Sequence, residues 1–219
     1  FTDLNAGTYT VQISTVAGTV GSPAPAQTLP GTNANTGDEV GATQGATANG
    51  VSEPVTLTNA NVTEVNLGIQ APPVAADVTA ASQVNPGGTT QVTVPPLDVT
   101  DPEDGTPTTV TITTLPTNGT LYYDGTPVVA GTPMPNLDPT KLTVDPNDGA
   151  VTVVFDYTTT DAAGVESEPA TVTMPFTTLS LSGTVFTDAD GATDTDVDGV
   201  APPAGINANL LNATGNVVA

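Results

Sequence analysis

The stretch Thr8-Tyr-Thr-Val-Gln-Ile13 alternates polar and apolar side chains, so that Tyr9, Val11 and Ile13 share one face of an extended strand. Short runs that read as strands recur along the chain, each bounded by Gly, Pro, Asn or Asp. No stretch shows sustained helical periodicity. We therefore predict an all-β protein built from tandem β-sandwich modules. The expected strands are Thr8–Ile13, Pro54–Thr58, Glu64–Gln70, Gln91–Val94, Thr109–Thr113, Gly119–Tyr123, Lys141–Val144, Val151–Tyr157, Ala170–Phe176 and Leu179–Phe186.

The residue types that are missing exclude much chemistry. The 219 residues include no His, Cys or Trp, which excludes Ser/His/Asp and Cys/His catalysis and the usual nitrogen and sulfur zinc sites. Lys141 is the one basic residue, so we expect no nucleic-acid binding and no attraction to anionic membranes. No apolar run reaches the roughly 18 residues that span a bilayer. Because few aromatic residues are present to stack on a sugar, paired carboxylates do not indicate a glycosidase, and we expect no enzyme.

The net charge of -22 has to be compensated, because self-repulsion would otherwise destabilise the compact state. High salt or bound divalent cations can do this. Many acidic residues lie in loops bounded by Gly, which favours bound cations over a halophilic protein with acids on every face. The halophilic secreted protein remains an alternative.

The chain divides into three segments by composition. Ala71-Pro72-Pro73 is typical of a short stiff linker. We predict one sandwich over residues 71–178, with residues 1–70 and 179–219 as parts of flanking domains. Residues 17–50 are rich in Gly, Ala, Thr, Asn and Pro, which fits either a flexible surface loop or a loop that orders around an ion or a partner.

The sharpest acidic cluster is Asp188-Ala-Asp-Gly-Ala-Thr-Asp-Thr-Asp-Val-Asp-Gly199. Calcium takes about six to eight oxygen ligands, often from alternate carboxylates beside a tight Gly turn. Gly205 stands where an EF-hand has its bidentate Glu, so this loop is not an EF-hand. A merely solvated loop is the alternative, but close carboxylates repel each other. We predict a calcium site, with Asp188, Asp190, Asp194, Asp196 and Asp198 as ligands.

A second candidate cluster joins Asp98, Asp101, Glu103 and Asp104, with Asp77 and Asp161 as further contributors. Calcium ligation and ordinary Asp-Pro and Asp-Gly turns are both open for this cluster. We assign Asp101, Glu103 and Asp104 as metal ligands. For Asp145 and Asp148 we expect a plain turn, whereas Asp38 and Glu39 are candidates to complete a site from the long loop.

The outer segments resemble one family. Leu181-Ser-Gly-Thr-Val-Phe-Thr-Asp-Ala-Asp-Gly191 resembles the start of the B-type domain of Gram-positive serine-aspartate repeat adhesins, and Leu211–Ala219 resembles a later strand and turn. Phe1-Thr-Asp-Leu-Asn-Ala-Gly-Thr-Tyr-Thr-Val11 and Val65-Asn-Leu-Gly-Ile-Gln70 resemble its later half. The resemblance implies prealbumin-like sandwiches, a calcium-binding acidic loop, and two half-domains that adjacent copies of the sequence complete.

The central segment resembles bacterial cadherin-like or immunoglobulin-like repeats. The resemblance rests on Asp101-Pro-Glu-Asp-Gly105, Leu115-Pro-Thr-Asn-Gly-Thr-Leu-Tyr122 and Phe155-Asp-Tyr-Thr-Thr-Thr-Asp-Ala-Ala-Gly164. Such repeats occur in very large secreted adhesins, and their acidic loops bind calcium at module junctions.

Together these features predict a structural repeat of a large bacterial cell-surface adhesin or extracellular filament, secreted or held at the cell surface, with Ca²⁺ as its cofactor. The expected partners are adjacent copies of the same repeat. An adhesive module that binds a surface glycan or a host protein directly is the alternative.

Overall fold

The computed structural model describes residues 1–103, 105–107, 109–185, 199 and 204–217. Within them the secondary structure is β throughout, apart from one 3-10 turn, η1 (Pro139–Lys141). The predicted all-β class is confirmed. The chain separates into two compact units, residues 1–178 and residues 179–219. No helix in the part of the chain described here is long and apolar enough to cross a membrane.

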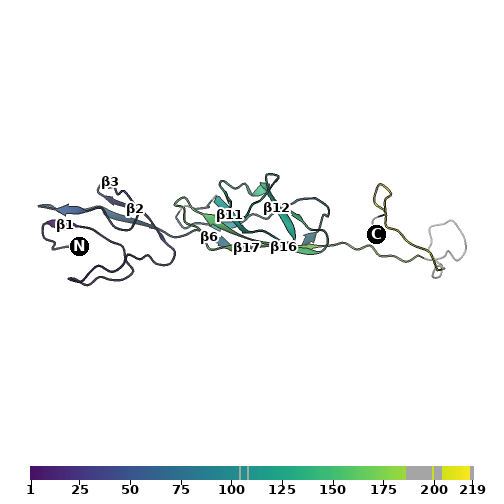
Figure 1. Cartoon of the computed structure of the whole chain (residues 1–219), viewed down its shortest axis with the longest axis horizontal. Coiled ribbons are helices and arrows are strands. Elements are labelled where there is room, and N and C mark those ends of the chain that lie inside the picture. Colours follow the sequence, from purple (N-terminus) through teal and green to yellow (C-terminus); the bar gives the residue numbers. More distant parts are fainter. Residues whose placement is uncertain (104, 108, 186–198, 200–203, 218–219) are drawn as a thin grey trace. The chain divides into compact units, whose positions relative to one another are not determined.

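Two sheets form a sandwich within the first unit (Figure 1). The larger sheet has the order β14-β11-β16-β17-β7, with β8 also paired to β17, and the smaller one has the order β13-β12-β15-β9. A separate strand pair joins β10 to β6. The bounds are β6 (Val74–Ala76), β7 (Val78–Thr79), β8 (Gln83–Val84), β9 (Val92–Thr93), β10 (Asp98–Thr100), β11 (Thr109–Thr114), β12 (Gly119–Tyr123), β13 (Thr126–Pro127), β14 (Pro133–Met134), β15 (Leu142–Pro146), β16 (Val151–Thr160) and β17 (Ala170–Thr177).

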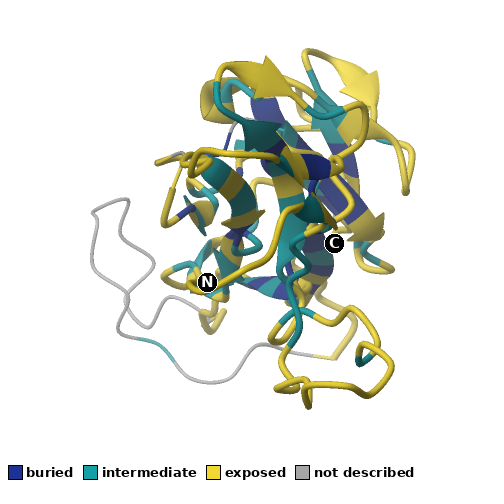
Figure 2. Ribbon diagram, turned by 90° about the vertical axis from the view of Figure 1, so that its left-hand side faces the viewer, coloured by how far each residue is buried: buried dark blue, intermediate teal, exposed yellow. Residues whose placement is uncertain are grey.

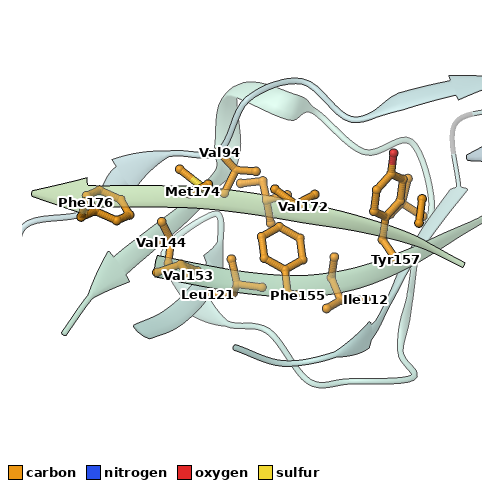
Figure 3. Close-up of a cluster of buried hydrophobic side chains, with 13 residues drawn as sticks. Val94, Ile112, Leu121, Val144, Val153, Phe155, Tyr157, Val172, Met174 and Phe176 are labelled. Atoms are coloured by element: carbon orange, nitrogen blue, oxygen red, sulfur yellow. The ribbon is translucent and has the colours of Figure 1, made fainter. Parts of the chain in front are cut away.

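Strict alternation in the sequence builds the core between these sheets. Every second residue of β17 is buried, and Val153, Phe155 and Tyr157 on β16 follow the same period. Leu121 and Val144 meet them from the smaller sheet (Figure 3). Buried residues accordingly follow the paired strands in Figure 2, while the loops are exposed. The core is aliphatic with few aromatic rings, as the composition requires.

Tyr157 carries the main polar contact of this core. Its ring is fully buried, and its hydroxyl donates to the carbonyl oxygens of Ala76 at 2.7 Å and Asp98 at 3.1 Å. One side chain of β16 therefore holds both strands of the β6–β10 pair. Burial raises the pKa of the Tyr157 phenol above its ordinary value.

The register of β17 shows how the chain passes through the sandwich. β17 runs antiparallel to β16 but parallel to β7 and β8, with Val172 beside Val78 and Phe176 beside Gln83. The chain therefore enters the sandwich near the start of β17 and leaves it past the end of the same strand. At about 3.3 Å per residue, β17 separates these two points by about 25 Å. The chain enters and leaves at opposite ends of the sandwich.

Residues 1–70 form two small sheets. β1 (Gly7–Tyr9) pairs with β4 (Val55–Leu57), and β2 (Ala34–Val40) lies between β3 (Thr43–Gln44) and β5 (Val65–Gln70). Val55, at 7% exposed, is the one buried hydrophobic residue among them. This segment therefore has paired strands but almost no apolar core of its own.

Three strand predictions need correction. The strand expected over Thr8–Ile13 ends at Tyr9, after which the chain forms only a bridge at Gln12. A strand is also expected over Leu179–Phe186. Residues 179–185 form no strand, because no neighbouring strand pairs with them. Conversely, the segment 17–50, expected to be a loop, contains β2 and β3.

The second unit is mostly irregular where it is described. A bridge between Leu211 and Val217 closes a turn in which the Asn212 side chain accepts hydrogen bonds from the backbone N–H groups of Thr214 and Asn216. The large apolar side chains of its described residues are exposed. They are Leu179, Leu181, Val185, Ile206, Leu210, Leu211 and Val217.

Candidate metal centre at the end of β5

The predicted metal ligands fall into two groups in the structure. One group lies outside the described residues. It consists of Asp104 and the five predicted ligands of the loop 188–199, which are Asp188, Asp190, Asp194, Asp196 and Asp198. Asp101 and Glu103 lie within the described residues, directly after β10. The site can therefore be built around these two carboxylates.

Asp101 is held by a tight turn. Its N–H donates to the carbonyl oxygen of Gly105 at 2.6 Å, and the N–H of Gly105 donates back to the Asp101 carbonyl at 3.2 Å. The Asp101 carboxylate accepts from the N–H of Glu103 at 2.8 Å. Gly105 adopts a φ of 84°, which favours Gly and explains the Asp-Gly pair at this point of the sequence.

Asp161 lies in a second turn of the same kind, after β16. Its carboxylate accepts from the N–H of Val165 at 2.7 Å, and its own N–H donates to the Val165 carbonyl at 3.0 Å. Gly164 closes this turn with a φ of 84°. Asp101 and Asp161 are both less than a tenth exposed, so the turns fix two nearly buried carboxylates.

Both loops meet the end of β5. The Gln70 side-chain amide donates to the Asp161 carboxylate at 3.1 Å. The N–H of the next residue, Ala71, donates to the Glu103 carboxylate at 3.4 Å. Since Gln70 and Ala71 are consecutive, one carboxylate from each of the two loops is hydrogen-bonded at the end of β5. We name Gln70, Asp101, Glu103 and Asp161 the junction site.

The donor set of the junction site fits a hard cation, because all its charged atoms are carboxylate oxygens on rigid turns. The fit is partial. Across the described ranges, no group of three or more acidic side chains is placed to hold a metal ion. Calcium takes about six to eight oxygens, so main-chain carbonyls, water and Asp104 would have to supply the remainder.

Two other acids of this predicted cluster serve the strands. The Asp77 carboxylate accepts from the N–H of Thr171 at 2.8 Å, which ties it to β17. Asp98 is exposed, and its carbonyl oxygen accepts from Tyr157. Elsewhere, the Asp148 carboxylate accepts from the N–H of Gly88 at 2.7 Å, a structural contact in the loop before β16.

Lys141 pairs with an acid outside this cluster. It forms an exposed ion pair with Asp124 at 3.0 Å, which raises the pKa of the Lys141 amine. Hydrogen bonds from Thr140 lower the pKa of the neighbouring Asp138 carboxyl. The one basic side chain of the chain therefore compensates none of the acids of the junction site.

Sequence reasoning missed Gln70 and a groove in residues 1–70 that apolar and polar side chains line together. An amide that ends a strand carries no signal of function in a sequence. The groove has a volume of about 860 Å³, and its apolar lining comes from both β1 and β4 and from the segment before β5. It is lined by residues that include Leu4, Val11, Val55, Leu57 and Val62.

No protein-family model matches this sequence, and neither curated proteins nor solved structures match it.

Proposed function

We propose that this chain is a structural repeat of a large bacterial cell-surface adhesin or extracellular filament, stiffened by calcium in its acidic loops. The observation that carries the proposal is the course of the chain through the sandwich. The chain enters beside Val172 and leaves beyond Phe176, at the other end of the same strand. A module of this kind adds its full length to an array with every copy, which suits a stalk or filament.

The junction site supports the calcium part of the proposal. Glu103 and Asp161 contact consecutive residues of the chain that leads into the sandwich. A cation shared by these loops would neutralise their charge and fix the linker at Ala71. The loop 188–199 would bind calcium in the same way. Because calcium would bind only the folded state, it stabilises by mass action.

Adjacent copies of the repeat are the proposed partners. Residues 1–70 bury one hydrophobic side chain, Val55, and leave a groove beside it whose lining includes Leu4 and Leu57. We propose that residues 179–219 of an adjacent copy cover this groove and complete a prealbumin-like sandwich, while residues 71–178 form an immunoglobulin-like one. The exposed apolar side chains of residues 179–219 favour this arrangement.

The proposed location is outside the cell. The junction site offers few carboxylates, and such sites bind calcium at about 10⁻⁴ to 10⁻³ M, the range of extracellular modules. The acidic surface and the single basic residue suit a structure exposed to divalent cations and not to nucleic acid.

Thermal unfolding with and without a chelator at fixed ionic strength tests the calcium part. Calcium at about 100 times its Kd stabilises a site by about 2.7 kcal/mol, so the Tm should fall clearly when it is removed. Replacing calcium by an equal ionic strength of sodium chloride should not restore the Tm. A Tm that follows salt alone would support the halophilic alternative and contradict the calcium proposal.

Hydrogen exchange tests the partner proposal. In a chain of two tandem copies joined by a short flexible linker, only the second copy has an adjacent copy preceding its residues 1–70. The amides of β1 and β4 in that copy should exchange more slowly than those in the first copy. Equal exchange in both copies, at a concentration where single copies do not associate, would contradict the completion of this segment by its neighbour.

A further inference from the structure

Asp38 is a buried carboxylate that the junction site does not use. It lies within β2 and is 8% exposed. Its carbonyl oxygen accepts from the N–H of Gly45 at 2.8 Å, which extends the antiparallel pairing of β2 and β3 by one residue. Its carboxylate has no hydrogen bond or ion pair within the described chain.

The Asp38 side chain lies on the wall of a cavity of about 430 Å³. Around it, the lining is rich in oxygen. Glu39 is part of this lining, and its carboxylate accepts from the Asn66 side chain at 2.6 Å. The other polar side chains of the lining are Thr36, Gln44 and Thr47. None of the residues of the lining is basic.

Two glycines leave room for these oxygens. A Cβ atom at Gly45 would overlap the carboxylate of Asp38, and one at Gly68 would lie 2.8 Å from the Thr36 hydroxyl. Neither Gly45 nor Gly68 adopts a positive φ, so backbone strain does not require glycine at either position. The absence of a side chain there matters for space alone.

We propose that Asp38 is the anchor of a second, separate cation site in residues 1–70, which takes a divalent cation of the calcium class. The hard oxygen donors of the cavity suit such an ion, and no protein donor among the described residues competes with the ion for the Asp38 carboxylate. At most two acidic side chains contribute, because no group of three is placed to hold a metal among the residues described. Affinity rises with ligand charge, so the expected Kd is about 10⁻⁴ to 10⁻³ M. The site requires neither the junction site nor a neighbouring copy.

Calcium titration of the full chain followed by amide NMR tests this site separately from the others. The amide signals of Gly45 and Gly68 should shift and saturate with a Kd in the stated range. In Asp38→Asn the shifts should be lost, or the Kd should rise by at least about tenfold, the equivalent of about 1.4 kcal/mol. Asp3→Asn is the matched control, because Asp3 is exposed and Asn tolerates its φ of 58°.

Gly45→Ala is the second variant. It keeps the charge of Asp38 but displaces the carboxylate, so it should weaken the same shifts, and it decides the question if Asp38→Asn does not fold. Asp161→Asn should leave the Gly45 and Gly68 shifts unchanged, which separates this site from the junction site. Absence of saturable shifts at Gly45 and Gly68 in the unmodified chain would overturn the proposal. So would shifts of the same Kd in the folded Asp38→Asn variant.

Discussion

The Gln70 side-chain amide donates a hydrogen bond of 3.1 Å to the Asp161 carboxylate, across 91 residues of sequence. Gln70 is the last residue of β5, and Asp161 begins the turn after β16. Each is less than a tenth exposed. This contact therefore joins residues 1–70 to the sandwich at a point that water hardly reaches, and it places one carboxylate of the junction site.

Gln70→Ala should destabilise the first unit by about 2 kcal/mol, because hydrogen bonds to charged groups contribute about 1.5–3 kcal/mol and the carboxylate of Asp161 stays behind. Chemical denaturation followed by circular dichroism measures the change. Gln44→Ala, which removes an exposed side chain of the same kind, should cost less than about 0.5 kcal/mol. Equal effects of the two variants would show that the contact contributes nothing.

Glu103→Gln separates calcium binding from the hydrogen bond to Ala71. The amide oxygen of Gln can still accept from the Ala71 N–H, so stability without calcium should stay within about 0.5 kcal/mol. The rise in Tm on adding calcium should shrink, since one charged ligand is lost. Glu168→Gln removes the same charge from an exposed position and should keep the full rise. An unchanged rise in Glu103→Gln would exclude Glu103 as a ligand.

Two neighbouring valines of β16 test the alternation that builds the sandwich. Val153 is fully buried, whereas Val154 points outward and is 44% exposed. Val153→Ala should cost about 2 kcal/mol, from the lost apolar burial and the cavity left behind. Val154→Ala should change the free energy of unfolding by less than about 0.5 kcal/mol. Similar losses would mean that the register of β16 is wrong.

Tyr157 should make the fold sensitive to alkaline pH. Burial raises its pKa in the folded state, so the unfolded chain loses the proton first. The contribution of Tyr157 is complete below its ordinary pKa of 10.0 and declines as the pH rises through the folded pKa. Tyr157→Phe should flatten this decline, because Phe has no proton to lose. It should also lower the free energy of unfolding at neutral pH by about 1–2 kcal/mol, because the hydrogen bonds to Ala76 and Asp98 are lost. Urea unfolding at a series of pH values, with Tyr122→Phe as control, measures both effects. A decline as steep as that of the unmodified chain would contradict this role.

The sequence predicted the sandwich best where side chains alternate strictly, as in β16 and β17. It failed at β2, because Ala-Asn-Thr-Gly-Asp-Glu-Val contains almost no apolar side chain. That strand forms because β5 supplies backbone hydrogen bonds along its length. The error over Leu179–Phe186 is the reverse, since an apolar pattern alone does not form a strand without a neighbour to pair with.

The candidate site was predictable only in its local parts. The Asp and Gly pairs at residues 101–105 and 161–164 indicate turns that present carboxylates. Their meeting at Gln70 depends on pairing between distant strands, which a single sequence does not contain. The burial of Asp38 was unpredictable for the same reason, because it depends on the fold of residues 36–48 against β5.

Small-angle X-ray scattering tests the central claim most directly, by comparing one copy of the chain with two tandem copies, in calcium and in chelator. A calcium-stiffened array predicts that two copies in calcium have roughly twice the maximum dimension of one, since each module adds its length end to end. Removing calcium should then lower the radius of gyration of the two-copy chain as its junctions loosen. A two-copy chain that folds into a compact particle, or whose scattering is the same in calcium and in chelator, would contradict this account.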